Sequence, residues 1–287
     1  MPELPEIEIV KRSLIKMINK ARIIDIKIKN KNLRYKIQNN FYKHLINEKI
    51  VKISRKSKYL ILYLKSKMLL VHFGMTGKFL ILKNKNNKIF KTSFYYNLNI
   101  LPKHNHVYFF LDGGRTLIYN DVRRFGFIKL YKGKKINGIS HIEKLGLEPF
   151  SKKLSVSYFK NHLKNKNTNI KVLLMDQTFI CGLGNIYVNE VLFLSNINPF
   201  RKCKSLSDKE IKKIILNIKF VLKLAISNGG SSIKDFNNTN GKSGSFQQLF
   251  RVYGREKKKC SSIPCKGIIK KINISNRSSF FCNKCQK

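Results

Sequence analysis

A change in hydrophobic periodicity near Pro149 most constrains how this chain can fold. From about residue 22 to 130, short runs of β-branched and aromatic residues are separated by Gly, Asn and Lys clusters, a pattern that predicts strands. After Pro149 the apolar residues recur at helical spacing. Strands without intervening helices favour an antiparallel sandwich, so we expect an α+β, multidomain chain with a β-sandwich first and a helical domain second.

The individual elements follow from these two patterns. A helix is expected over residues 5–20, where Pro5 stands at the first position and acidic residues fill the first turn. Strands are expected at Ile23–Ile28, Tyr59–Leu64, Leu69–Phe73, Val107–Leu111 and Thr116–Tyr119, with a hairpin turn at Asp112–Gly114. Helices are expected at residues 155–164, 168–177, 185–195 and 207–227, and a glycine-rich loop at 237–245.

The cysteines cluster at the end of the chain. Four of the six form the pattern Cys260-x4-Cys265-x16-Cys282-x2-Cys285, and the N-terminus has no basic segment followed by an apolar run. In a chain without a secretion signal, such clustering favours a metal over disulfides. Four thiolates can close a tetrahedral site, so the sequence predicts one structural Zn²⁺ ion.

The charge indicates a polyanionic partner. The chain carries 59 Lys and Arg against 15 Asp and Glu, a formal net charge of +44, and such a surface attracts phosphates. An AT-rich genome would also favour the abundant Lys, Ile and Asn, so the charge alone does not establish a function.

The most apolar stretch, residues 59–75, is interrupted by Lys65 and Lys67. We therefore expect no membrane association and a cytoplasmic location.

The amino-terminal sequence Met1-Pro2-Glu3-Leu4-Pro5-Glu6 suggests a nucleophile. Removal of Met1 would leave a secondary amine on Pro2, and an amine with a pKa of about 8 is partly unprotonated at neutral pH. Its attack on an aldehyde-level carbon would give a cationic iminium that withdraws electrons and promotes elimination. The alternative is that Pro2 and Pro5 only organise the start of a helix, with the acidic residues complementing its dipole.

Further short motifs follow in a fixed order along the chain. They are Ser57–Leu60, His72–Gly77, Lys103–Val107, Asp121–Gly126, Leu174–Gln177, Gly182–Tyr187, Gly229–Gly230 with Lys234–Phe236, and Val252–Arg255, before the cysteines. Together with Pro2–Glu6 they resemble the formamidopyrimidine-DNA glycosylase family over the whole length. The resemblance implies a catalytic β-sandwich at 1–133, a linker at 134–149, a helix–two-turn–helix DNA-binding domain at 150–228, a lesion-covering loop and connector at 229–251, and a zinc finger at 252–287.

The resemblance also implies the chemistry. A bifunctional glycosylase and AP lyase of this family removes oxidised purines, such as 8-oxoguanine and formamidopyrimidines, and cuts the strand by β- and δ-elimination. Pro2 would attack C1′ to form a Schiff base, and Glu3 would be its acid–base partner. Lys58 matches a strand lysine held near the terminus, and Arg277 matches a finger arginine that assists the second elimination.

The resemblance assigns DNA contacts as well. Met75, Arg123 and Phe125 would enter the space left by the extruded lesion. His104, Lys166, Lys171 and Asn185 fall on positions that contact phosphates or build the cleft, and Glu6 and Glu190 support the active site. The expected partner is double-stranded DNA containing oxidised bases or abasic sites, bound by a monomer.

Two departures and two alternatives accompany this interpretation. The family usually has two residues between the first cysteine pair and Pro where Val122 stands. The related endonuclease VIII group acts on oxidised pyrimidines but typically has Gly where Leu4 stands. A noncatalytic zinc-ribbon protein that binds nucleic acid would explain the charge and the cysteines, although it would not explain Pro2 or Lys58.

Overall fold

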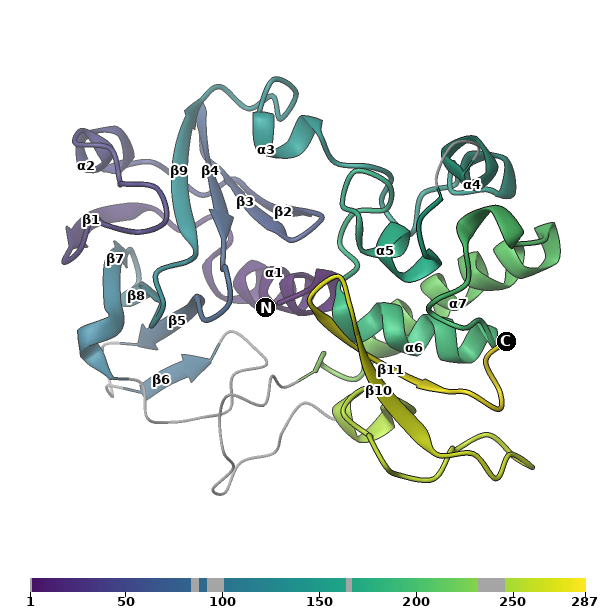
Figure 1. The fold of residues 1–287 in the computed structure, drawn as a ribbon. Coiled ribbons are helices and arrows are strands. Elements are labelled where there is room, and N and C mark those ends of the chain that lie inside the picture. The colour runs from purple at the N-terminus through teal and green to yellow at the C-terminus, as the bar shows by residue number, and fades with distance from the viewer. Residues whose placement is uncertain (1, 84–87, 92–100, 164–166, 232–245) are drawn as a thin grey trace. The chain divides into compact units, whose positions relative to one another are not determined.

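The computed structural model describes residues 2–83, 88–91, 101–163, 167–231 and 246–287, with only the backbone described for 88–91 (Figure 1). The chain divides into two compact units. The first comprises Met1–Gly138 with Gly229–Ser245, and the second comprises Ile139–Asn228 with Phe246–Lys287. Each unit therefore contains segments that are far apart in the sequence.

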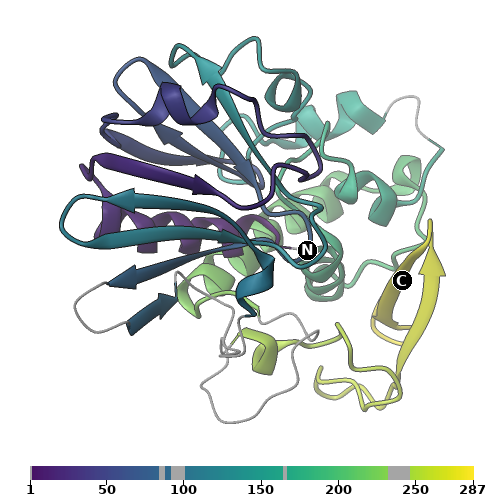
Figure 2. The ribbon, with the colours of Figure 1, turned by 90° about the vertical axis from the view of Figure 1, so that its left-hand side faces the viewer.

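The first unit is an antiparallel β-sandwich with a leading helix, as predicted (Figures 1 and 2). One sheet has the order β1-β7-β8-β5-β6, with β1 at Ile23–Ile28, β5 at Lys78–Lys83, β6 at Lys88–Lys91, β7 at Asn105–Leu111 and β8 at Arg115–Asn120. The other has the order β2-β3-β4-β9, with β2 at Lys52–Lys56, β3 at Tyr59–Tyr63, β4 at Lys67–His72 and β9 at Phe127–Lys132. Helix α1 (Leu4–Ile18) packs against β2 and β3, and the sequence analysis missed the short α2 (Phe41–Leu45).

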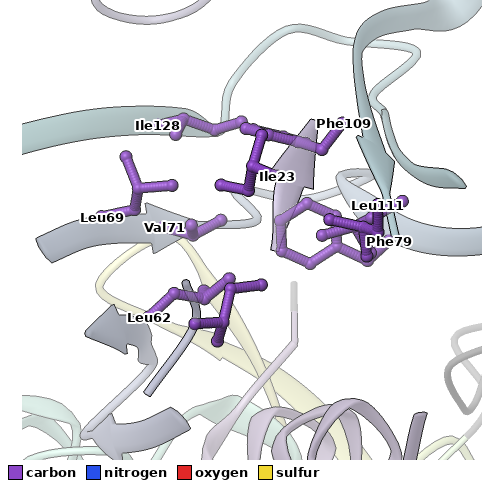
Figure 3. A pocket seen from close by; sticks show the side chains of 10 residues that line it. Ile23, Leu62, Leu69, Val71, Phe79, Phe109, Leu111 and Ile128 are labelled. Atoms are coloured by element: carbon purple, nitrogen blue, oxygen red, sulfur yellow. The ribbon is translucent and has the colours of Figure 1, made fainter. Parts of the chain in front are cut away.

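The core of the first unit lies between its two sheets and α1. Helix α1 contributes Val10, Leu14 and Ile18, which recur at helical spacing and are at most 2% exposed. A residual space of about 10 Å³ in this core is lined only by apolar side chains, including Phe79 and Phe109 (Figure 3). A space this small, without polar partners, holds neither a ligand nor an ordered water molecule, so it belongs to the packing of the sandwich.

The second unit is helical and ends in a β-hairpin. Its helices are α3 (Ser140–Glu143), α4 (Val156–Leu163), α5 (Ile170–Met175), α6 (Asn185–Ser195) and α7 (Asp208–Ser227). The hairpin consists of β10 (Ile269–Ile274) and β11 (Arg277–Cys282), and β11 contacts α6. The four helices expected from periodicity are present, whereas α3 is too short to give a periodic signal. Among the described residues, no helix is both long enough and apolar enough to span a membrane.

A reciprocal cap fixes the start of α7. The Ser207 hydroxyl accepts a hydrogen bond from the Glu210 backbone N–H at 3.4 Å, and the Glu210 carboxylate accepts from the Ser207 N–H at 2.8 Å. Glu210 also pairs with Arg201 at 3.1 Å. A capping box satisfies N–H groups that have no partner within the helix, so this cap anchors α7 at its first turn.

Replacing Ser207 by Ala should therefore lower the free energy of unfolding by about 1 kcal/mol, the usual cost of losing an N-cap. Urea denaturation monitored by circular dichroism measures this change. Ser227→Ala at the other end of the same helix is the matched control, because the exposed Ser227 hydroxyl caps no backbone N–H: it donates to the Leu224 carbonyl and accepts weakly from the Asn228 side-chain amide. Equal effects of the two substitutions would show that the cap contributes nothing specific.

Candidate active site and metal centre

The start of the chain is held by a buried carboxylate. Pro2 is buried, and Glu3, which is 3% exposed, is the N-cap residue of α1. The Glu3 backbone N–H donates to Glu6 Oε2 at 2.9 Å. The other Glu6 oxygen accepts from the Ser231 backbone N–H at 2.9 Å and from its hydroxyl at 3.0 Å. Glu6 thus fixes the backbone beside Pro2 and ties it to a segment more than 200 residues later in the chain.

The expectation that Lys58 lies on a strand is wrong. Lys56 pairs directly with Tyr59 across β2 and β3, so Ser57 and Lys58 form the two-residue turn between these strands. Ser57 has a φ of +54°, as tight hairpin turns require for at least one residue. Lys58 is only 6% exposed, which is unusual for a turn lysine. The turn therefore buries Lys58 instead of presenting it to solvent.

An ion pair that the sequence analysis missed links this turn to α1. The Arg55 Nε donates to Glu8 Oε2 at 3.2 Å, and its Nη1 donates to the Ser57 carbonyl at 3.0 Å. Glu8 also pairs with Lys11 at 2.7 Å and Arg12 at 3.0 Å. Burial raises the pKa of Glu8, but the hydrogen bonds and charges of these three cations outweigh it and lower the pKa overall. An ionised Glu8 therefore holds Arg55, and Arg55 holds the turn that carries Lys58.

The three residues that the family resemblance assigns to the space of the extruded lesion lie together at the surface of the first unit. They are Met75, Arg123 and Phe125. The Arg123 guanidinium lies 4.4 Å from the centre of the Phe125 ring, and its Nη1 is 3.0 Å from Met75 Sδ. Phe125 is 45% exposed. The three side chains come from two loops, one between β4 and β5 and the other between β8 and β9. An exposed aromatic ring and a guanidinium are suited to binding a partner by stacking.

An open pocket of about 590 Å³ adjoins this group. It is lined by Asn32, Leu33, Arg34, Arg123, Arg124 and Phe125. Residues 32–34 were not predicted from the sequence, because a short loop between strands carries no distinctive pattern. Arg34 is joined to the group through its backbone N–H, which donates to the Gly126 carbonyl at 3.1 Å.

The other predicted residues of the first unit are less completely described. His104 is partly exposed at the end of the η2 turn (Pro102–His104), and burial followed by the charge of Lys103 lowers its pKa. His104 is thus neutral at neutral pH and can still donate one hydrogen bond.

The loop expected at 237–245 and the Lys234–Phe236 motif lie outside the described residues, as does Lys166 of the second unit.

In the second unit, Lys171 and Asn185 converge on one backbone carbonyl of β11. The Lys171 ammonium donates to the Ser278 carbonyl at 2.9 Å and to the Ser279 hydroxyl at 2.6 Å. The Asn185 amide donates to the same carbonyl at 3.0 Å. Lys171 is 1% exposed, and burial followed by the charge of Arg277 lowers its pKa to about 8. Both side chains therefore support the strand that begins at Arg277, whose own side chain is exposed.

Glu190, farther along α6, also holds a distant backbone segment. It is 2% exposed, and it accepts the backbone N–H groups of Arg251, Val252 and Tyr253 at 2.9, 3.1 and 2.8 Å. Burial raises the pKa of Glu190, while these three hydrogen bonds oppose that rise. The contact fixes the segment that leads from the helices into the cysteine cluster.

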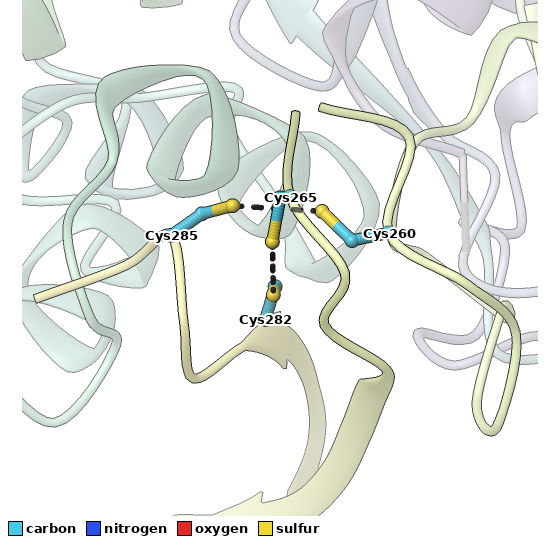
Figure 4. Close-up of side chains that lie close together, drawn as sticks. All are labelled: Cys260, Cys265, Cys282 and Cys285. Carbon is cyan, nitrogen blue, oxygen red and sulfur yellow. Dashed lines mark hydrogen bonds between the residues drawn. The ribbon is translucent and has the colours of Figure 1, made fainter. Parts of the chain in front are cut away.

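The four clustered cysteines come together as the sequence predicts (Figure 4). Their Sγ atoms all lie within 4.8 Å of one another; the Cys260–Cys285 and Cys265–Cys282 pairs are 3.6 and 3.8 Å apart. These distances are too long for disulfides, which measure about 2.05 Å. Backbone N–H groups point at two of the sulfurs, as Gly267 does at Cys265 with 3.3 Å. The longer Cys260-x4-Cys265 spacing still closes a four-thiol site that can hold one metal ion.

Comparisons with known proteins agree with this arrangement. Residues 1–128 match the model of the formamidopyrimidine-DNA glycosylase N-terminal domain, and residues 145–237 match that of the formamidopyrimidine-DNA glycosylase H2TH domain. The formamidopyrimidine-DNA glycosylase of Dinoroseobacter shibae is 38% identical over all of both chains. That of Rickettsia africae is 40% identical over 100% of this chain and 99% of its own.

A solved structure extends the agreement to three dimensions. The Lactococcus lactis Fpg, in complex with DNA containing an abasic site, superposes with a TM-score of 0.85 at 32% identity over 99% of each chain. Both matched domains, the full-length relatives and the shared fold lead to one conclusion. The chain belongs to the formamidopyrimidine-DNA glycosylase family.

Proposed function

We propose that this protein is a bifunctional DNA glycosylase and AP lyase that removes oxidised purines from double-stranded DNA. The observation that carries the proposal is the amino-terminal arrangement, in which Pro2 and Glu3 are fixed by Glu6 at the start of α1. Helix α1 packs against the hairpin whose turn carries Lys58. The family membership supports the same activity: Lactococcus lactis Fpg forms a complex with DNA containing an abasic site, and a mutant of it forms one with DNA containing Fapy-dG.

The chemistry uses these residues in sequence. After removal of Met1, the Pro2 nitrogen gives up its proton and bonds to C1′ of the damaged nucleotide as the bond from C1′ to the base breaks, and the base leaves with a proton. The bond from C1′ to the ring oxygen O4′ then opens while Glu3 delivers a proton to O4′, which leaves an iminium between Pro2 and C1′ of the opened sugar. The resulting iminium draws electrons, so loss of the C2′ proton expels the 3′ phosphate, and a second elimination expels the 5′ phosphate. The Lys58 ammonium disfavours protonation of a nearby amine, and Arg277 binds phosphate during the second elimination.

The domain roles follow from the same proposal. Residues 150–228 form the helix–two-turn–helix DNA-binding domain and residues 252–287 the zinc finger, while Met75, Arg123 and Phe125 fill the space of the extruded lesion. His104 and Lys166 contact phosphates. Lys171 and Asn185 act at least partly through β11, because both donate to the Ser278 carbonyl next to Arg277. Two sequence features favour oxidised purines over oxidised pyrimidines as substrates: Leu4, and the set of Met75, Arg123 and Phe125.

Trapping with borohydride tests the nucleophile directly. Protein with a verified Pro2 terminus, incubated with duplex DNA containing 8-oxoguanine opposite cytosine, should give a covalent adduct on reduction. Retention of Met1 should abolish the adduct because the amine is blocked, and Pro2→Gly should greatly diminish it. Pro5→Ala is the matched control, since it changes a proline of the same segment and leaves the amine intact.

Three outcomes separate the alternatives. A noncatalytic nucleic-acid-binding protein gives no adduct with any lesion, and an enzyme of the endonuclease VIII type reacts faster when the duplex carries an oxidised pyrimidine. Undiminished crosslinking by Pro2→Gly together with the Met1-retaining form would rule out Pro2 as the nucleophile.

Substitution of Arg55 tests whether activity depends on the contact between α1 and the turn that carries Lys58. Arg55→Lys keeps the charge but cannot reach both Glu8 and the Ser57 carbonyl with a planar fork. We expect the single-turnover rate of adduct formation on abasic DNA to fall about tenfold or more, because small misplacements of reacting groups are costly. The DNA affinity should stay the same. Arg12→Lys is the control: Arg12 also pairs with Glu8 but is 59% exposed and does not contact the turn in the described contacts. Equal rates for both variants would contradict this role.

The metal bound by the four cysteines is, we propose, a structural zinc ion. Thiolates about 2.3 Å from a tetrahedral zinc ion lie roughly 3.8 Å apart, and two of the Sγ pairs measure 3.6 and 3.8 Å. Four thiolates leave no open position for a substrate, so the ion would stabilise the hairpin rather than take part in the reaction.

Cys282→Ala should lower the zinc content well below one ion per chain and weaken the hydrogen-exchange protection of β10 and β11, since metal binding and local folding are coupled. Cys203→Ala is the matched control because Cys203 is also fully buried but lies outside the cluster. Elemental analysis of the purified proteins measures the ion. An unchanged zinc content in Cys282→Ala would refute the assignment.

A further inference from the structure

Asp121 is a buried acid to which neither the motif comparison nor the proposed chemistry assigns a role. It follows β8 and is 0% exposed. Its Oδ1 accepts the Thr76 hydroxyl at 2.5 Å, and its Oδ2 accepts the Gly126 backbone N–H at 2.9 Å and, more weakly, the Tyr119 hydroxyl at 3.5 Å. Thr76 belongs to the loop of Met75, and Gly126 belongs to the loop of Arg123 and Phe125. One carboxylate thus joins both loops.

Thr76 extends this connection to Arg123. While its hydroxyl donates to Asp121, its oxygen accepts the Arg123 backbone N–H at 3.0 Å. The Asp121 backbone is held as well, because its carbonyl accepts from His106 Nε2 at 2.7 Å and its N–H donates to the His104 carbonyl at 3.0 Å. Since a carbonyl can only accept, His106 carries its proton on Nε2. These contacts leave Asp121 with little freedom to reorient.

Glycines bring the two loop backbones into direct contact. A Cβ added at Gly74, whose φ is +58°, would overlap the backbone of Phe125, and a Cβ added at Gly126 would overlap the His72 carbonyl. The close approach means that one loop cannot shift without displacing the other. The carboxylate and the tight backbone contact therefore define one rigid platform beneath Met75, Arg123 and Phe125.

From this geometry we propose that Asp121 is a positioning residue that preassembles Met75, Arg123 and Phe125 before DNA binds. Ordering exposed side chains and loops during binding would cost conformational entropy, and a preformed platform avoids that cost. The advantage is confined to the step in which a paired base leaves the helix and the three side chains replace it. Asp121 touches no reacting atom, so the chemistry at Pro2 does not depend on it. This inference rests on the proposed function.

Asp121→Asn tests the proposal because it preserves size but replaces one of the two acceptor oxygens with an NH2 donor, so the side chain can no longer accept from both Thr76 and Gly126. Single-turnover excision of 8-oxoguanine opposite cytosine should slow about tenfold or more, as expected when a buried hydrogen-bond network is broken. Cleavage of a preformed abasic site in single-stranded DNA, where no base is extruded, should change less than twofold. Asp112→Asn, which removes one charge from the exposed β7–β8 turn, should change neither rate.

A second set of variants addresses folding and specificity. Thr76→Val removes the hydroxyl that links Asp121 to Arg123 and should reproduce the selective defect, whereas Thr76→Ser should restore excision. The defect in Asp121→Asn should also shrink when the lesion lies opposite an abasic position, because extrusion then costs less. These readouts apply to folded protein, which the unfolding transition of each variant verifies.

Two results would overturn the proposal. One is unchanged excision in both Asp121→Asn and Thr76→Val; the other is an equal loss of excision and of single-stranded abasic-site cleavage, which would indicate a general effect on the fold or the chemistry. Absence of any adduct with the unmodified protein would instead contradict the proposed function itself, so the two failures are distinguishable.

Discussion

The position of the amino-terminal residues in the first unit depends on the hydrogen bonds of the buried Glu6 carboxylate. This carboxylate accepts the Glu3 backbone N–H and two donors of Ser231, so it fixes the free end of the chain, normally the most mobile part of a protein. A buried carboxylate is costly unless several donors surround it, and the same donors that offset this cost also define its orientation. The nucleophile proposed at Pro2 requires a terminus with one defined position, and Glu6 provides that constraint.

Buried carboxylates also join distant segments at other points of the structure. Glu8 holds Arg55 and through it the turn of Lys58, Asp121 joins two loops of the sandwich, and Glu190 holds the segment before the cysteine cluster. In a chain with only 15 acidic residues, these buried carboxylates each connect segments that the sequence separates. The abundant lysines are different, because most are solvated and could vary with genome composition without affecting the fold. Among the described residues, Lys58, Lys78 and Lys171 are buried, and the net charge does not reveal these exceptions.

The exposed side chains of the candidate site are thus held in place by buried neighbouring residues that fix their backbone. Arg123 and Phe125 are exposed, yet the backbone from which they extend is fixed by Asp121, Thr76 and the close approach of two glycines. Arg277 is likewise exposed at the start of a strand whose next carbonyl is held by Lys171 and Asn185. In this member of the formamidopyrimidine-DNA glycosylase family, exposed groups are free to meet DNA while their positions remain defined.

The sequence by itself determined the class of fold, the position of most elements, the four-cysteine centre and the family, because periodicity and motif order are local properties of the chain. The candidate residues Glu3, Lys58 and Arg277 follow only from the family resemblance that the motifs carry, whereas Pro2 is also suggested by its place beside Met1. Tertiary structure decided their surroundings: Lys58 lies in a turn rather than on a strand because Lys56 pairs with Tyr59, and Lys171 points at β11. Only the folded chain brought Glu8 to Arg55 and Asp121 to Thr76, since such contacts join residues 47 and 45 positions apart, and no local pattern records which distant donor a buried carboxylate will meet.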